Sequence, residues 1–127
     1  MRRLRSQPVR TVVVLPTFNE AENIVGFLRA VRQAVPDADV LVVDDNSPDG
    51  TAVLAEEVAS ELGRVKVLRR AGKQGLGAAY RHGFVTAFDE GYDAIVSMDS
   101  DFSHDPVVIP TMLRLVEDGA DAVIANL

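Results

Sequence analysis

The sequence contains no cysteine, so it has neither a disulfide framework nor thiolate ligands for a metal. It has no apolar run that approaches the length needed to cross a bilayer. Its N-terminal basic residues Arg2, Arg3 and Arg5 are not followed by the apolar stretch of a signal peptide. These absences favour a cytoplasmic location.

Positive charge is also scarce. Thirteen Lys and Arg residues stand against 19 Asp and Glu residues, which gives a formal net charge of -6. A surface of this sign repels a phosphate backbone, so nucleic-acid binding is not expected. The 127 residues fit one domain, and no repeat, low-complexity tract or linker divides them. We therefore assign residues 1–10 to a basic tail and residues 11–127 to one folded unit.

The rest of the sequence alternates between short apolar runs and segments with helical periodicity. The runs are typical of strands buried on both faces and cover residues 11–15, 40–43, 65–68, 94–98 and 122–125. The segments between them carry apolar residues at helical spacing, such as Ile24, Phe27, Leu28 and Val31 in the first and Ile109, Met112, Leu115 and Val116 in the last. This alternation predicts an α/β fold, a Rossmann-like parallel sheet with helices on both faces.

Polar segments follow three of the predicted strands, at residues 16–20, 44–50 and 99–106. In parallel sheets of this kind, ligands bind beyond the carboxyl ends of the strands. These three segments are therefore the candidates for a binding site, whereas residues 36–39 lie at the opposite edge.

Asp99 and Asp101 are the candidates for a metal site. Two carboxylates two residues apart in an extended segment point the same way, and Mg²⁺ or Mn²⁺ prefers such oxygen ligands. Chance alone predicts about one Asp-x-Asp in this composition, and Asp37-Ala38-Asp39 is a second match. We interpret the second match as a turn, because only Asp99-Ser100-Asp101 follows a strand. A turn with a helix cap is the structural alternative for Asp99-Ser100-Asp101.

Asp44 and Asp45 are adjacent acids, whose mutual repulsion makes a purely structural role unexpected unless one of them holds a turn. A buried Asp at this edge can accept hydrogen bonds from a base or a ribose. Residues 47–51 have turn and helix-start chemistry, with Ser47 or Asp49 as the helix cap.

The glycines of residues 72–79 resemble a dinucleotide-binding fingerprint, but Tyr80 occupies the third glycine position and the segment follows the third strand. Close approach of the backbone to another loop or a ligand explains them better. Nearby lie five basic residues, which form either a solvated edge or a surface near phosphates: Arg64, Lys66, Arg69, Arg70 and Lys73. His82 and His104 are assigned to packing or surface.

Four motifs occur together in the order typical of one enzyme family. They are Val14-Leu15-Pro16-Thr17-Phe18-Asn19-Glu20, Val43-Asp44-Asp45-Asn46-Ser47-Pro48-Asp49-Gly50-Thr51, Gly75-Leu76-Gly77-Ala78-Ala79-Tyr80 and Met98-Asp99-Ser100-Asp101-Phe102-Ser103-His104. With these motifs the chain resembles the dolichol-phosphate (polyprenol-phosphate) mannosyltransferases, inverting glycosyltransferases of family 2 with the GT-A fold. The resemblance implies that residues 11–127 form the N-terminal, nucleotide-sugar-binding half of a GT-A domain, shortened relative to the family. It also implies metal-dependent transfer of mannose from GDP-mannose to a polyprenyl phosphate.

The resemblance further implies which residues form the site. Those expected to bind the nucleotide-sugar are Pro16, Phe18, Glu20, Val43, Asp45, Met98, Asp99, Ser100 and Asp101. Those expected near the Mg²⁺ or Mn²⁺ ion are Asp99, Asp101 and Ser103, of which Asp99 and Asp101 are also the catalytic candidates. Two positions depart from the family pattern: Phe18 replaces a usual Tyr, and Ser103 stands where many members have Gln.

The implied reaction needs no Ser-His-Asp arrangement, and we find none. A phosphate monoester, with a second pKa of about 6, is mostly dianionic at neutral pH and needs no general base. Family members continue well beyond Leu127, into the half that shapes the acceptor site. We therefore expect a parent protein at the cytosolic face of a membrane. The isolated chain is expected to bind donor weakly without transferring sugar, and to self-associate through an exposed fifth strand.

Three alternatives are retained. The first is a related lipid-phosphate glycosyltransferase that uses another nucleotide-sugar, and the second is a non-catalytic nucleotide-sugar-binding module. The third is a receiver-type phosphoacceptor domain, which would be phosphorylated on Asp99. In receivers, however, the acidic pair ends the first strand, whereas Asp44 and Asp45 follow the second predicted strand here.

Overall fold

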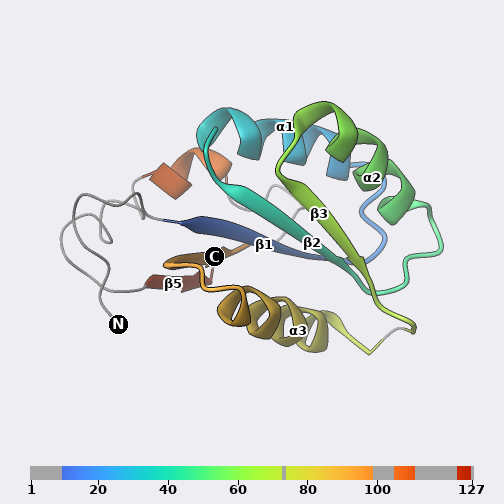
Figure 1. Ribbon diagram of the computed structural model, residues 1–127. Coiled ribbons are helices and arrows are strands. Elements are labelled where there is room, and N and C mark those ends of the chain that lie inside the picture. The colour runs from blue at the N-terminus through green and yellow to red at the C-terminus, as the bar shows by residue number, and fades with distance from the viewer. Residues whose placement is uncertain (1–9, 73, 99–104, 111–122, 127) are drawn as a thin grey trace.

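The computed structural model describes residues 10–72, 74–98, 105–110 and 123–126. They form a five-stranded sheet in the order β3-β2-β1-β4-β5, in which every neighbouring pair is parallel (Figure 1). The strands are β1 (Thr11–Thr17), β2 (Asp39–Asp44), β3 (Val65–Arg69), β4 (Ala94–Ser97) and β5 (Val123–Asn126). The helices are α1 (Ile24–Ala34), α2 (Thr51–Leu62) and α3 (Leu76–Asp89), and the short 3-10 helix η1 spans Pro106–Val108.

The sheet is covered on both faces, with α1 and α2 on one side and α3 on the other (Figure 1). Side chains of a strand alternate between faces, so Val13 and Leu15 of β1 join the cluster under α1 and α2, while Val12 and Val14 join the cluster under α3. Every residue of β1 is buried. This explains why its sequence is almost continuously apolar, as is typical of a central parallel strand.

The predicted α/β architecture is confirmed. β1 continues to Thr17, two residues beyond the predicted run, so Pro16 and Thr17 belong to the strand and not to the following loop. Of the predicted fourth helix, residues 111 onward lie outside the described residues, and the described part begins with η1. β5 lies at an edge of the described sheet, as expected for the fifth strand. None of the helices in the described ranges is long and apolar enough to span a membrane.

α3 approaches the sheet closely at Gly83, which is buried. A Cβ atom at this position would lie 2.7 Å from Val14 Cγ1 and 2.8 Å from Val43 Cγ2. Both distances are too short for carbon atoms in contact, so only glycine allows the helix to pack at this depth. The close packing brings the first turn of α3 beside the carboxyl end of β2.

Candidate functional site

The carboxyl ends of β1, β2 and β4 meet at one edge of the sheet, and most of the predicted site residues that the structure describes lie there. Pro16, Val43 and Met98 are buried, and Val43 packs in the cluster under α3 whereas Met98 packs in the cluster under α1 and α2. Phe18 and Glu20 are partly exposed just beyond β1. The four residues predicted around the metal and diphosphate, Asp99, Ser100, Asp101 and Ser103, lie outside the described residues.

Asp44 shapes the turn that follows β2. Its buried carboxylate accepts hydrogen bonds from Thr17 Oγ1 at 2.7 Å, from the Ser47 backbone N–H at 2.9 Å and from Ser47 Oγ at 2.6 Å. The Ser47 hydroxyl oxygen in turn accepts from the backbone N–H of Asn19 at 2.9 Å. Asp44 therefore holds a turn. A structural role for one of the two adjacent acids is expected only in this case.

Asp49 and Thr51 join the loop after β2 to the loop after β1. Asp49 accepts from the backbone N–H groups of Ala21 at 3.1 Å and Thr51 at 3.0 Å, and Thr51 Oγ1 accepts from the Glu20 N–H at 3.0 Å. Burial alone would raise the pKa of Asp49, but the hydrogen bonds from Thr51 and Ala21 outweigh it and lower the pKa below its ordinary value. The carboxylate thus stays ionised and keeps the two loops together.

The prediction that Ser47 or Asp49 is the N-cap of α2 is wrong. Gly50 occupies the N-cap of α2 with a φ of +89°, and no side chain caps the helix there. A left-handed backbone favours glycine, and Asp49 instead bonds the first N–H of the helix from one residue further back.

Asp45 is fully buried and binds the segment between β3 and α3. Its carboxylate accepts from the backbone N–H of Gln74 at 3.0 Å and of Gly75 at 2.8 Å, and from Arg70 Nε at 3.0 Å. The close approach predicted as the reason for these glycines is not found: a Cβ at Gly72 or Gly75 would meet nothing within 4 Å, although the Gln74 and Gly75 amides do bond the loop after β2. Gly75 has a φ of +96°, a backbone conformation that favours glycine.

The basic cluster divides once it is folded. Arg69 pairs with Glu56 on the surface, and Arg64 pairs with Asp39 at 3.5 Å. Arg70 turns inward to Asp45 at the candidate edge. The sequence offered no means of distinguishing these three residues, because their roles follow from the direction in which each side chain leaves β3 and its flanking turns. Lys73 lies outside the described residues.

The sequence that follows β4 has donor chemistry suited to a hard cation. β4 reaches the edge beside β1, since the Met98 N–H donates to Val14 O at 3.3 Å, and the Asp99-Ser100-Asp101 motif follows directly in the chain. Carboxylate and hydroxyl oxygens are the donors that Mg²⁺ and Mn²⁺ prefer. Asp99 and Asp101 themselves lie outside the described residues, and among the described ones no three His, Asp or Glu side chains form a group that could hold a metal.

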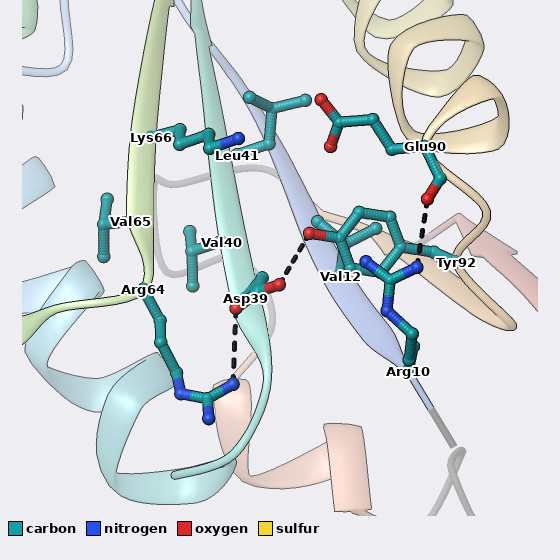
Figure 2. A pocket seen from close by; sticks show the side chains of 10 residues that line it. All are labelled: Arg10, Val12, Asp39, Val40, Leu41, Arg64, Val65, Lys66, Glu90 and Tyr92. Carbon is teal, nitrogen blue, oxygen red and sulfur yellow. Dashed lines mark hydrogen bonds and ion pairs between the residues drawn. The ribbon is translucent and has the colours of Figure 1, made fainter. Parts of the chain in front are cut away.

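A hollow of about 560 Å³ lies at the opposite, amino-terminal edge of the sheet (Figure 2). Two of its charged side chains, Asp39 and Arg64, pair with each other, and Arg10 contacts Tyr92 and a backbone carbonyl. Asp39 accepts from Tyr92 Oη at 2.6 Å and from Arg64, and the Arg10 guanidinium stacks over the Tyr92 ring at 4.6 Å while donating to Glu90 O at 3.0 Å. Asp39 therefore has a structural role at the start of β2. Pro36 and Asp37 form a turn, but Asp39 already belongs to β2, so the interpretation of residues 37–39 as a turn is correct only for its first part.

Tyr92 gives this edge a measurable signature. Burial, followed by the hydrogen bond and the negative charge of Asp39, raises the pKa of Tyr92 to about 12. Because this lies above the ordinary value of about 10, the stabilisation is complete below about pH 10 and is lost as the pH rises towards 12. The chain has two tyrosines and no tryptophan, so phenolate absorbance reports the titration cleanly. We expect a late step near pH 12 that disappears in Tyr92→Phe; a late step that survives in this variant would contradict the assignment.

Comparison with protein families and curated sequences gives consistent matches. The model of the family described as Glycosyl transferase family 2 matches residues 12–127. A polyprenol monophosphomannose synthase of Mycolicibacterium smegmatis is 46% identical over 118 residues, which are 92% of this chain and 44% of that protein. An undecaprenyl-phosphate mannosyltransferase of Micrococcus luteus is 47% identical over 118 residues, 93% of this chain and 48% of that protein. The chain thus spans less than half the length of these relatives.

A solved structure has a similar fold. It is the mannosyltransferase PcManGT from Pyrobaculum calidifontis in complex with GDP-Man and Mn²⁺, with a TM-score of 0.62 and 24% identity. The match covers 76% of this chain and 29% of that one. At this identity the similarity supports the GT-A fold.

Proposed function

Because the chain belongs to glycosyl transferase family 2, we propose that it is the donor-binding part of an inverting enzyme that transfers mannose from GDP-mannose to a polyprenyl phosphate. The observation that carries this proposal is the joining of residues 17–21 to residues 44–51 at the carboxyl ends of β1 and β2. These segments fall within the region that is 46–47% identical to relatives named for polyprenyl-phosphate mannosyl transfer.

The proposed nucleotide-binding residues are those of the resemblance. Phe18 and Glu20 lie partly exposed beyond β1, where they are accessible to a nucleotide. Asp99 and Asp101, with Ser103, would hold Mg²⁺ or Mn²⁺. When bound, this ion neutralises the charge that develops on the departing diphosphate.

The acids at this edge support a reaction without a general base. Asp44, Asp45 and Asp49 each accept hydrogen bonds from hydroxyl, backbone or guanidinium groups of the protein. Each of these three carboxylates is therefore engaged in holding the protein's own groups, and none is assigned as a general base that removes a proton from the acceptor. A dianionic phosphate acceptor needs no such removal, and its attack depends on alignment with the anomeric carbon.

The relatives contain further regions outside the part that matches this chain. We assign binding of the acceptor to those regions. We propose that contacts with the polyprenyl chain and the cytosolic membrane surface belong to those regions. By itself, the 127-residue polypeptide would then bind donor without turnover. β5, at the sheet edge, is the surface through which the isolated polypeptide would self-associate.

Donor choice tests the proposal. With Mn²⁺ present, we expect GDP-mannose to bind about tenfold more tightly than UDP-glucose, a difference of about 1.4 kcal/mol. The reason is that a site built to hydrogen-bond one base leaves its polar groups unpaired with another. Titration calorimetry of both nucleotide-sugars and of free GDP measures the difference. Tighter binding of UDP-glucose would assign the chain to a related branch of the family that uses another donor.

A further inference from the structure

Arg70, directly after β3, makes polar contacts with three different segments of the chain. Its side chain is only 11% exposed. Nε donates to Asp45 at 3.0 Å, Nη2 donates to Gln74 Oε1 at 2.6 Å, and Nη1 contacts Ala78 O at 3.2 Å and His82 Nδ1 at 3.1 Å. Its backbone N–H donates to Asp44 O at 2.8 Å. Arg70 thus joins the end of β2, the segment before α3 and the first two turns of α3.

Three N–H donors hold the buried Asp45 carboxylate. A carboxylate has about four acceptor positions. Oδ1 accepts from Arg70 and, at 3.2 Å, from the Gln74 N–H, while Oδ2 accepts from the N–H groups of Gln74 and Gly75. The Gln74 N–H is shared between the two oxygens, so three donors fix the orientation of a carboxylate that the family resemblance places against a nucleoside.

We infer that Arg70 is a positioning residue for the donor site, which acts by fixing Asp45 and the backbone of Gln74 and Gly75. The inference rests on the proposed function. Arg70 neutralises a buried carboxylate beside the edge where a diphosphate would bind, and an unpaired charge there would repel the diphosphate. It also fixes the backbone of residues 74–75 against the end of β2, so the loop is already in its bound arrangement when the donor arrives.

Arg32 provides a matched control at the opposite edge. Its guanidinium also makes four hydrogen bonds, to the carbonyl oxygens of Val35, Pro36, Ala38 and Gly63, at 2.7–3.3 Å. Arg32→Met therefore removes as many bonds as Arg70→Met, but far from the candidate site. If donor affinity falls in Arg70→Met but not in Arg32→Met, the loss reflects positioning of the site and not a general loss of structure.

The experiment measures the Kd for GDP-mannose with Mn²⁺ in the wild-type chain and both variants, by titration calorimetry. We expect Arg70→Met to raise the Kd about tenfold, because charge-assisted hydrogen bonds are lost beside the site, and Arg32→Met to leave it within about twofold. Equal affinity of wild type and Arg70→Met would overturn the inference. Absence of any binding by the wild-type chain would instead overturn the proposed function on which it rests.

A second measurement needs no variant and remains valid if Arg70→Met does not fold. Coupling between two equilibria is reciprocal, so saturating GDP-mannose should slow hydrogen exchange at the Gln74 and Gly75 amides of the wild-type chain, by about tenfold for a tenfold coupling. The Val40 amide, which bonds Arg64 O near the opposite edge, should exchange at an unchanged rate relative to the other core amides. Unchanged exchange at Gln74 and Gly75 on saturation would overturn the inference.

Discussion

Replacing Asp101 with Asn is expected to abolish the metal dependence of nucleotide binding while leaving the fold intact. The substitution keeps the size of the side chain and removes the charge that a divalent cation requires. Loss of one partner of a desolvated charge pair costs about 2–5 kcal/mol, so the affinity for GDP-mannose with Mn²⁺ should fall about 30-fold or more. Calorimetric titration with and without Mn²⁺ measures both the affinity and its dependence on the metal.

Asp37→Asn is the control for this substitution. Asp37 belongs to the second Asp-x-Asp sequence, and its exposed side chain lies at the amino-terminal edge of the sheet. Neither nucleotide affinity nor the unfolding midpoint should change. If the two variants behave alike, position after a strand does not distinguish a metal motif from a chance match, and the assignment of Asp99 and Asp101 fails.

The second large effect concerns stability. Gly83→Ala places a methyl group 2.7 Å from Val14 Cγ1 and 2.8 Å from Val43 Cγ2, between α3 and two buried strands. Overpacking of this kind costs about 1–3 kcal/mol. The better helix propensity of Ala, about 1 kcal/mol, offsets only part of a cost at the upper end of that range. We expect a net loss of about 1–2 kcal/mol in the free energy of unfolding, measured by urea denaturation.

Gly77→Ala, in the same helix, controls for helix propensity. A Cβ at Gly77 meets nothing closer than an Arg81 side-chain nitrogen at 3.6 Å, an ordinary contact. This variant should be as stable as the wild type or more stable, by up to about 1 kcal/mol. A Gly83→Ala protein that gains stability like Gly77→Ala would show that α3 does not pack on the sheet at the depth described.

Much of the fold follows from local sequence patterns. The continuous apolar runs of β1 and β2 predict buried parallel strands, and the helical spacing of Ile24, Phe27 and Leu28 predicts the face that α1 turns to the sheet. These features depend on neighbours along the chain, which a sequence displays directly. The location of the candidate site at the carboxyl ends follows in turn from the parallel order of strands.

Features that depend on contacts across the chain did not follow from the sequence. Arg70 was one of five basic residues, and its partner Asp45 lies 25 positions away. Gly83 carried no local turn signal, because its role is to let a helix approach Val14 and Val43. The sequence predicts a cap at Ser47 or Asp49 and not at Gly50, because both side chains favour caps; in the structure they join two loops.

The central claim is that GDP-mannose and a divalent ion bind at the carboxyl edge of the sheet, and Mn²⁺-induced line broadening in amide NMR spectra tests it most directly. The chain, at 13.7 kDa, is small enough for such spectra. When Mn²⁺ is added in the presence of GDP-mannose, we expect the strongest broadening at the amides of Phe18, Glu20 and Met98, with little at Asp39 and Tyr92. Broadening centred on Asp39 and Tyr92, around the hollow at the amino-terminal edge, would contradict the claim.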